Sequence, residues 1–277
     1  MQRWWHRANR LIVGLGFALL IGACQVSSSH QAERAQDQTR ELRVVTSGGF
    51  AAAYTLLSPE FEAQTGVRLV TAYGSSSGGA PDSIPMRLER SEPFDVIILS
   101  KPSLNNLTEL GYLRPESRRD LVRSSIGMAV REGAAVPDIS TPEAFQAVLL
   151  EAASIGYSAS ASGTYLSTDL FPRLGIWGAL EPKSTRILSE RVASVVARGD
   201  VEIGFQQISE ILPIEGAHYV GPIPAAYQRV TTFSTGITKG ARNVSDAQRL
   251  IEFLSSIEVA PRVAETGLSP VVLEQGP

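Results

Sequence analysis

The chain has 277 residues, of which 43% are hydrophobic and 19% charged, and its formal net charge is −3. The length suggests one large or two small domains, and the apolar fraction is large enough for a hydrophobic core, which excludes a disordered chain. Residues 1–24 hold three Arg and no acidic residue, so the rest of the chain carries 22 basic against 28 acidic residues, a net charge of −6. This balance argues against a nucleic-acid-binding protein. The single Cys excludes a disulfide framework and a cysteine-rich metal site.

The N-terminal segment has the features of a bacterial secretion signal. Three Arg precede an uninterrupted apolar run over 11–23, which is shorter than the about 20 residues needed to span a bilayer. The run ends in Ile21-Gly22-Ala23-Cys24, which resembles the lipobox of bacterial lipoproteins. We therefore predict a signal peptide over 1–23, a lipid anchor on Cys24 and a flexible tether over 24–40. The alternative is an ordinary signal peptide with a chance Cys. Either way the functional part lies in the periplasm, and the membrane leaflet stays open.

Beyond the tether, the hydrophobic pattern alternates between strand-like and helix-like segments. The expected strands are 42–46, 67–73, 94–99, 154–157, 201–205 and 230–237. The expected helices are 50–64, 84–90, 142–153, a segment after Gly163, 191–198 and 245–256. This alternation predicts an α/β architecture with largely parallel strands.

Three loops rich in hydroxyl groups each follow an expected strand and precede an expected helix. They are Thr46-Ser47-Gly48-Gly49, Gly74-Ser75-Ser76-Ser77-Gly78 and 158–164 (SASASGT). Ligands of open α/β sheets bind at the carboxyl ends of the strands, where free N–H groups at helix starts favour anions. Each loop alone is also typical of a helix N-cap. The three together favour a neutral binding pocket rich in hydrogen-bond donors.

Taken in chain order, these loops and several further segments are similar to one family. The further segments are 94–100 (FDVIILS), 161–165 (ASGTY), 196–205 (VARGDVEIGF) and Gly267-Leu268. Over 42–272 the chain resembles the molybdate-binding branch of the periplasmic solute-binding proteins that feed ABC importers. The resemblance implies a type II two-lobe α/β fold, in which each lobe is a mixed, mostly parallel sheet flanked by helices and two hinge crossings join the lobes. It places one lobe at 41–124 with 229–277 and the other at 125–228.

The resemblance also implies a ligand site between the lobes. Carried over position by position, the implied ligand contacts are Ser47, either Ser76 or Ser77, Ser162 with Gly163, and a position near Gln207. The neighbouring Gly48, Ser75 and Gln206 complete the predicted set of ligand-binding residues. Gln207 falls near a position where the molybdate binders have a Tyr, and this change leaves room for a larger ligand, such as a carboxylate. We therefore predict a monomer that captures a small anion, either a molybdate-like oxyanion or a small organic acid, for an ABC permease of the inner membrane. It needs no cofactor or metal and does not catalyse a reaction.

Two other functions are compatible with parts of the sequence. Gly74-Ser75-Ser76-Ser77-Gly78 fits the G-x-S-x-G elbow of α/β hydrolases, with Ser76 as the nucleophile. The base would then have to be His218, because the other two His precede residue 41. A binding lobe of this type can also present its ligand to a sensor. Finally, Arg131 and Arg191 are candidates to enter the cleft and bind a carboxylate through two hydrogen bonds.

Overall fold

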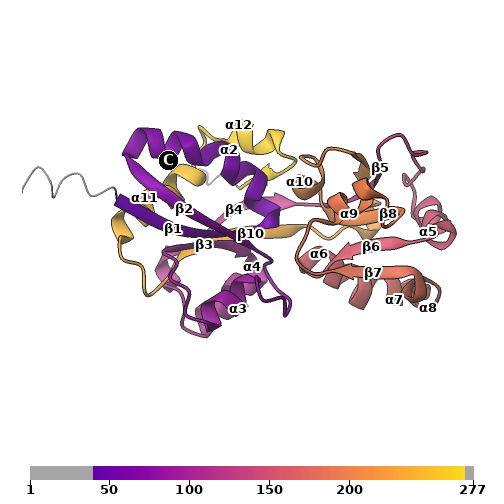
Figure 1. Cartoon of the computed structure of the whole chain (residues 1–277), viewed down its shortest axis with the longest axis horizontal. Coiled ribbons are helices and arrows are strands. Elements are labelled where there is room, and N and C mark those ends of the chain that lie inside the picture. Colours follow the sequence, from indigo (N-terminus) through magenta and orange to yellow (C-terminus); the bar gives the residue numbers. More distant parts are fainter. Residues whose placement is uncertain (1–39, 272–277) are drawn as a thin grey trace, which may run out of the picture. The chain divides into compact units, whose positions relative to one another are not determined.

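Two β-sheets flanked by helices organise the computed structural model, which describes residues 40–271 (Figure 1). The described residues beyond Arg40 form one compact unit. The first sheet has the order β11-β4-β10-β3-β1-β2 and the second the order β7-β6-β8-β5-β9. The strands of the first sheet are β1 (Arg40–Ser47), β2 (Val67–Gly74), β3 (Val96–Ser100), β4 (Arg119–Ser124), β10 (Thr231–Ile237) and β11 (Ser269–Pro270). Those of the second are β5 (Ile126–Arg131), β6 (Ile155–Ser158), β7 (Ser184–Ile187), β8 (Ile203–Gln207) and β9 (Ala217–Pro222).

Helices occupy most of the connections between strands. Those connected to the first sheet are α2 (Gly48–Thr65), α3 (Ile84–Glu89), α4 (Lys101–Glu109), η1 (Pro115–Ser117), α11 (Val244–Leu254) and α12 (Ala260–Glu265). Those between strands of the second are α5 (Pro142–Glu151), α6 (Ala161–Tyr165), the π-helical η2 (Leu166–Leu170), α7 (Phe171–Arg173), α8 (Trp177–Leu180), η3 (Glu181–Lys183), α9 (Val192–Arg198) and α10 (Ile208–Ile211). The short η4 (Ala225–Tyr227) lies between β9 and β10.

The chain passes between the two sheets twice. The first crossing joins β4 to β5, and the second leads from β9 through η4 to β10. The side chain of Gln228, on the second crossing, holds the start of β5 on the first. Its Oε1 accepts a hydrogen bond from the backbone N–H of Ile126 at 2.8 Å, and its Nε2 donates to the carbonyl oxygen of Ile126 at 2.9 Å. The two crossings are therefore bound to each other directly.

The sheets contain more antiparallel pairs than the alternation of strands and helices predicts. β1 with β3, and β6 with both β7 and β8, are parallel, as expected for strands joined through helices. β10 instead runs antiparallel to β3 and β4, and β5 runs antiparallel to β8 and β9. The difference arises at the crossings, because β10 and β5 are each entered from the other sheet and run against their neighbours.

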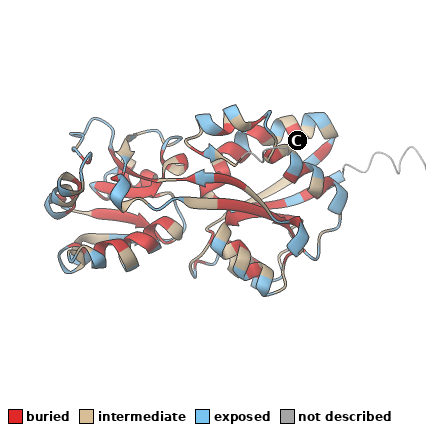
Figure 2. Cartoon of the chain, turned by 180° about the vertical axis from the view of Figure 1, so that it is seen from behind, coloured by how far each residue is buried: buried red, intermediate tan, exposed pale blue. Residues whose placement is uncertain are grey.

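Each sheet carries its own hydrophobic core, and Figure 2 shows the buried residues concentrated along the strands and the inner sides of the helices. On α2 the buried side chains are Phe50, Tyr54, Leu57 and Phe61, which recur at helical spacing. The helix ends at Gly66, whose φ of 67° closes the last turn with a hydrogen bond to Glu62. The predicted 50–64 helix is confirmed, and α2 begins two residues earlier.

Several elements differ from those expected. α4 was not predicted: it starts with a Pro in its first turn and buries only Leu104 and Leu107, which leaves a weak helical pattern. The helix expected after Gly163 begins at Ala161, so Ser162 and Gly163 lie inside it. Among the residues that the structure describes, no helix is long and apolar enough to cross a membrane. The predicted signal peptide, the anchor at Cys24 and residues 24–39 of the predicted tether lie outside the described residues, and the last tether residue, Arg40, already belongs to β1.

Candidate functional site

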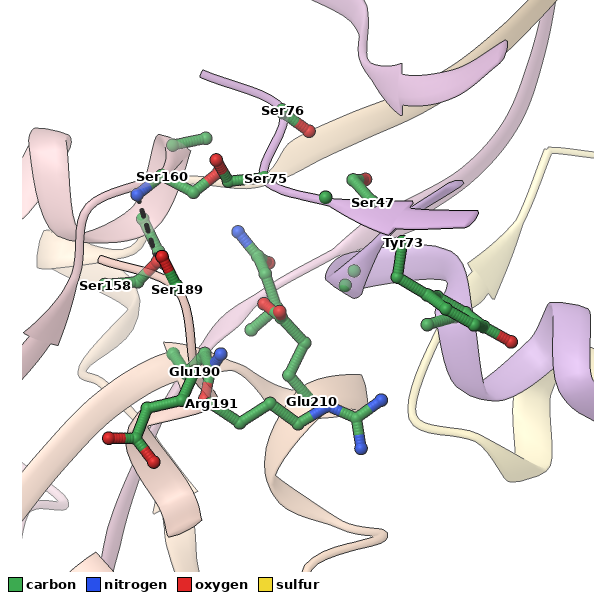
Figure 3. A pocket seen from close by; sticks show the side chains of 18 of the residues that line it. Ser47, Tyr73, Ser75, Ser76, Ser158, Ser160, Ser189, Glu190, Arg191 and Glu210 are labelled. Carbon is green, nitrogen blue, oxygen red and sulfur yellow. Dashed lines mark hydrogen bonds between the residues drawn. The ribbon is translucent and has the colours of Figure 1, made fainter. Parts of the chain in front are cut away.

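A cavity of about 180 Å³ lies where four strands from the two sheets end (Figure 3). β1 and β2 of the first sheet end at Ser47 and Gly74, and β6 and β8 of the second end at Ser158 and Gln207. All four of these residues line the cavity. The volume is below the 300–1,000 Å³ typical of sites for drug-sized ligands, which indicates a small ligand.

Seven of the nine predicted contact residues line this cavity. They are Ser47, Gly48, Ser75, Ser76, Ser162, Gln206 and Gln207. Ser77 does not: it lines a different cavity, together with Lys101 and Arg229. Gly163 is not a lining residue either. It packs against the end of β6, where a Cβ atom on it would lie 1.7 Å from the carbonyl oxygen of Ser158. Contact of the seven with a ligand stays a prediction.

Ser47 lies between β1 and α2, on the first-sheet side of the cavity. Its side chain is buried, and its Oγ has no hydrogen-bond partner within the described residues. The next residue, Gly48, begins α2, whose 18 residues direct a full helix dipole and unpaired N–H groups at this point. A buried hydroxyl without a partner costs about 1–3 kcal/mol. An anion at this position would accept hydrogen bonds from Ser47 and from the helix start.

Ser76 is the residue that the hydrolase alternative requires as nucleophile. It is buried, and its Oγ accepts a hydrogen bond from the backbone N–H of Ser100 at 2.9 Å. This bond fixes the loop after β2 and leaves the hydroxyl hydrogen free to donate. None of the described residues that line the cavity is a His, and His218 lies on β9. The cavity therefore offers Ser76 no histidine base, and the hydrolase alternative loses its support.

The two Gln at the end of β8 are both buried. Gln207 donates from Nε2 to Oγ1 of Thr231 at 3.1 Å, which joins β8 to β10, while its Oε1 has no partner in the described structure. Gln206 accepts from the backbone N–H of Ala193 at 3.4 Å and forms a side-chain hydrogen bond with the carboxylate of Glu210. Gln207 thus lines the cavity and keeps one buried oxygen without a partner in the described structure, whereas Gln206 holds Glu210.

Glu210, on α10, is the most unusual lining residue and was not among the predicted site residues. Burial raises the pKa of its carboxyl from the ordinary 4.5 to about 7. The nearby charge of Arg191 and the hydrogen bonds from Gln206 and Gln207 lower it, but by less. The carboxylate lies against the start of α2, because a Cβ atom on Gly48 would be 1.9 Å from its Oε1. No periodicity or motif in the sequence marks this residue.

The remaining lining residues include one of the two predicted Arg. Arg191 lines the cavity together with the acidic residues Asp82, Glu190 and Glu210. Arg131 does not, and its guanidinium lies near Gly199 instead. Ser158 and Ser160 of the predicted loop 158–164 also line the cavity, and further lining side chains that no sequence pattern indicated are Tyr73, Leu188 and Ser189.

The comparisons with known proteins agree with this architecture. The family described as bacterial extracellular solute-binding protein matches residues 42–269, which is most of the chain. The chain belongs to this family. Its fold is similar to that of the periplasmic molybdate-binding protein of Azotobacter vinelandii, at a TM-score of 0.68 and 20% identity, covering 84% of this chain and 100% of that one. A periplasmic thiamin-binding protein matches at a TM-score of 0.65 and 14% identity, covering 87% of this chain and 86% of that one. The predicted type II two-lobe α/β fold is confirmed.

A characterised relative is closer in sequence than these structures. It is an aconitate isomerase from a Pseudomonas species, 40% identical over 230 residues, which are 83% of this chain and 88% of that protein. Membership of the family supports the expected binding of a small solute and the periplasmic location. The relative, however, is named for a catalytic activity, so the solute-binding fold does not by itself exclude catalysis.

Proposed function

We propose that this protein is a periplasmic isomerase that binds aconitate, or a closely similar unsaturated tricarboxylate, and interconverts its cis and trans forms. The observation that carries this proposal is the position of Glu210, a partly buried carboxyl against the start of α2, with a pKa raised to about 7, in a cavity rich in hydrogen-bond donors. The name of the 40% identical relative supports the choice of substrate. The proposal replaces the expectation of a protein that binds without catalysis.

The reaction is a proton transfer that needs no oxidant or reductant. Aconitate carries a methylene group next to its carbon–carbon double bond. Removal of one methylene proton by the Glu210 carboxylate gives a carbanion delocalised over the three-carbon unit and its carboxylates. Return of the proton to the other end of this unit shifts the double bond and allows either geometry to form. The substrate loses one proton and regains one, so the two isomers have the same composition.

The cavity supplies what this reaction requires. A general base works best when its pKa is close to the operating pH, and burial brings Glu210 into that range. Donors that point at the developing charge stabilise the carbanion. The hydroxyl of Ser47, the N–H groups at the start of α2 and the hydroxyl of Ser162 lie around the same cavity.

The test is to incubate the purified protein with trans-aconitate and to follow the cis isomer by proton NMR. We expect interconversion, with deuterium entering the product in heavy water. Glu210→Gln should lower the rate by about 10²–10⁴-fold, the range for loss of a general base. Glu215→Gln, an exposed glutamate just beyond α10, is the matched control and should be fully active. No interconversion by the wild type, or full activity of Glu210→Gln, would contradict the proposal.

Capture of a small anion for delivery to an ABC permease is the second candidate. The family match and the three serine loops around the cavity favour it. The same purified protein separates the two candidates. A capture protein is stabilised against heat by its ligand, whether molybdate or an organic acid, and returns that ligand unchanged, whereas an isomerase converts aconitate.

We also propose that the protein is a monomer anchored through a lipid on Cys24 and that its lobes meet at 124/125 and 228/229. The single Cys at the end of the apolar run supports the anchor. In cell fractionation with detergent partitioning, Cys24→Ser should move the protein from the membrane fraction to the soluble periplasm. Unchanged partitioning would disprove lipidation.

A further inference from the structure

The charges that line the cavity are unevenly balanced. Of its described lining residues, Arg191 carries the positive charge, against the three carboxylates of Asp82, Glu190 and Glu210. Glu210 accepts hydrogen bonds from Gln206 and Gln207, and the other two carboxylates have partners of their own. Glu190 accepts from both terminal nitrogens of Arg198, at 2.8 and 3.1 Å, and Asp82 accepts from the hydroxyl of Ser189 at 3.2 Å.

Arg191 and Glu210 are left facing the same space, and Figure 3 shows both side chains in the cavity. Within the described residues, the guanidinium of Arg191 has no hydrogen bond or salt bridge. A guanidinium presents five N–H donors in a planar fork, which fits a carboxylate through two parallel hydrogen bonds. Its charge is nevertheless felt by Glu210, because Arg191 is the largest influence that keeps that carboxyl ionised.

The cavity therefore has two separate positions for negative groups. One is the start of α2 with the unpaired hydroxyl of Ser47, on the side of the first sheet. The other is Arg191, which precedes α9 on the side of the second sheet. Glu210 lies between the second sheet and the helix start, in contact with Gly48. A ligand with one carboxylate can use one of these positions, and a ligand with several can use both.

We propose that Arg191 selects polycarboxylates by binding a second carboxylate of the ligand, and that this ligand thereby takes Arg191 away from Glu210. The ligand group neutralises the charge that favoured the ionised form of Glu210 and adds negative charge beside it. Both changes favour the protonated form. Binding is thus accompanied by partial proton uptake on Glu210. The ionised fraction of Glu210 falls, but the carboxylate that remains is a stronger base for the methylene proton, and this happens only when a substrate with the correct number of carboxylates is present.

Other charged and titratable groups around Glu210 do not provide this coupling. Asp82 and Glu190 are held by Ser189 and Arg198, and Tyr73 lies on the side of the first sheet with its hydroxyl 3.3 Å from that of Thr55. Gln206, Gln207 and Gly48, which contact or bind Glu210, carry no charge. Arg191 is consequently the group that, when a ligand carboxylate binds it, changes the protonation of Glu210.

The inference rests on the proposed function for the choice of a tricarboxylate, and its test avoids turnover. Tricarballylate has three carboxylates but no double bond, so it binds without being isomerised. Isothermal titration calorimetry near pH 7, in two buffers of different ionisation enthalpy, gives both its dissociation constant and the number of protons taken up. Arg191→Gln should weaken binding by about 10- to 100-fold, as expected for lost hydrogen bonds to a charged group.

Two further variants make the result specific. Arg191→Lys, which keeps the charge but not the fork, should lie between the wild type and Arg191→Gln. Arg186→Gln removes an exposed Arg of the neighbouring β7 that does not line the cavity, and it should bind normally. Proton uptake should be smaller in Arg191→Gln and absent in Glu210→Gln. Thermal unfolding of each variant shows that it is folded.

The outcomes separate the two proposals. Arg191-dependent binding of tricarballylate by a protein that does not interconvert aconitate would support this inference and refute the isomerase. Equal binding by the wild type and Arg191→Gln, equal proton uptake by the two, or no binding by the wild type would overturn the inference, whether or not aconitate is isomerised.

Discussion

The substitution Gly48→Ala tests whether the position of the Glu210 carboxylate matters for activity, because it should displace this carboxylate without lowering the stability of the fold. A Cβ atom at this position would lie 1.9 Å from Oε1 of Glu210 and 2.9 Å from its Cδ. Ordinary contacts between non-bonded atoms are about 3.5 Å, so the carboxylate has to move by roughly 1.5 Å. Because the end of a flexible side chain can yield, and because Gly48 is helical, the substitution is compatible with folding.

The expected effects on stability and activity have opposite directions. Ala in a helical position stabilises a protein by about 0.4–1 kcal/mol relative to Gly, since the unfolded chain loses freedom. A displacement of about 1 Å within a catalytic site can lower the rate by about 100-fold. We therefore expect Gly48→Ala to unfold at the same or a slightly higher temperature than the wild type, and to interconvert aconitate about 100-fold more slowly.

Gly178→Ala is the matched control. Gly178 lies in α8, away from the cavity, and a Cβ atom on it would meet nothing within 4 Å. It should gain the same stability and keep full activity. Scanning calorimetry and the NMR assay measure the two quantities on the same samples. If Gly48→Ala were as active as Gly178→Ala, the position of the Glu210 carboxylate against α2 would have no role in the reaction.

The remaining predictions concern the pH dependence, the substrate and the anchor. The pKa of Glu210 is raised on folding from 4.5 to about 7, so ionisation of this carboxyl lowers the free energy of unfolding. The loss is absent below pH 4.5, grows between pH 4.5 and 7, and is complete above pH 7. Urea unfolding of the ligand-free protein should therefore show that Glu210→Gln is more stabilising at pH 8 than at pH 4, by up to about 3 kcal/mol. If the substitution had the same effect on stability at both pH values, the pKa of Glu210 would be ordinary. Arg191→Gln should weaken the binding of tricarballylate, measured by calorimetry. Cys24→Ser should leave the membrane fraction, measured by cell fractionation.

Much of the fold and the position of the site follow from local sequence patterns. The strand ends at Ser47, Gly74 and Ser158 are marked by apolar runs that stop at small hydroxyl-rich loops, and these ends converge on the cavity. The pattern could not choose between Ser76 and Ser77, because the direction of each side chain is set by the local backbone of the loop.

The proximity of Glu210 and Arg191 in the cavity could not be predicted from the sequence. They are 19 positions apart, on α10 and in the segment before α9, and they meet because both segments pack around the end of β8. The raised pKa of Glu210 depends on atoms from α2, which lies more than 140 residues earlier in the chain. Such a property arises from tertiary packing, and a scan of motifs or periodicity has no access to it.

The two hydrogen bonds between the side chain of Gln228 and the backbone of Ile126 restrict how the two crossings can move. One primary amide supplies both an acceptor and a donor to the backbone of Ile126, the first residue of β5, as a neighbouring β-strand would, although Gln228 itself lies between the strands β9 and β10. A rotation of one lobe against the other that keeps this pair of hydrogen bonds must move both crossings together, because bending one crossing alone would break both bonds. A rotation that moves the two crossings together preserves both hydrogen bonds, whereas sliding of one crossing past the other would break them.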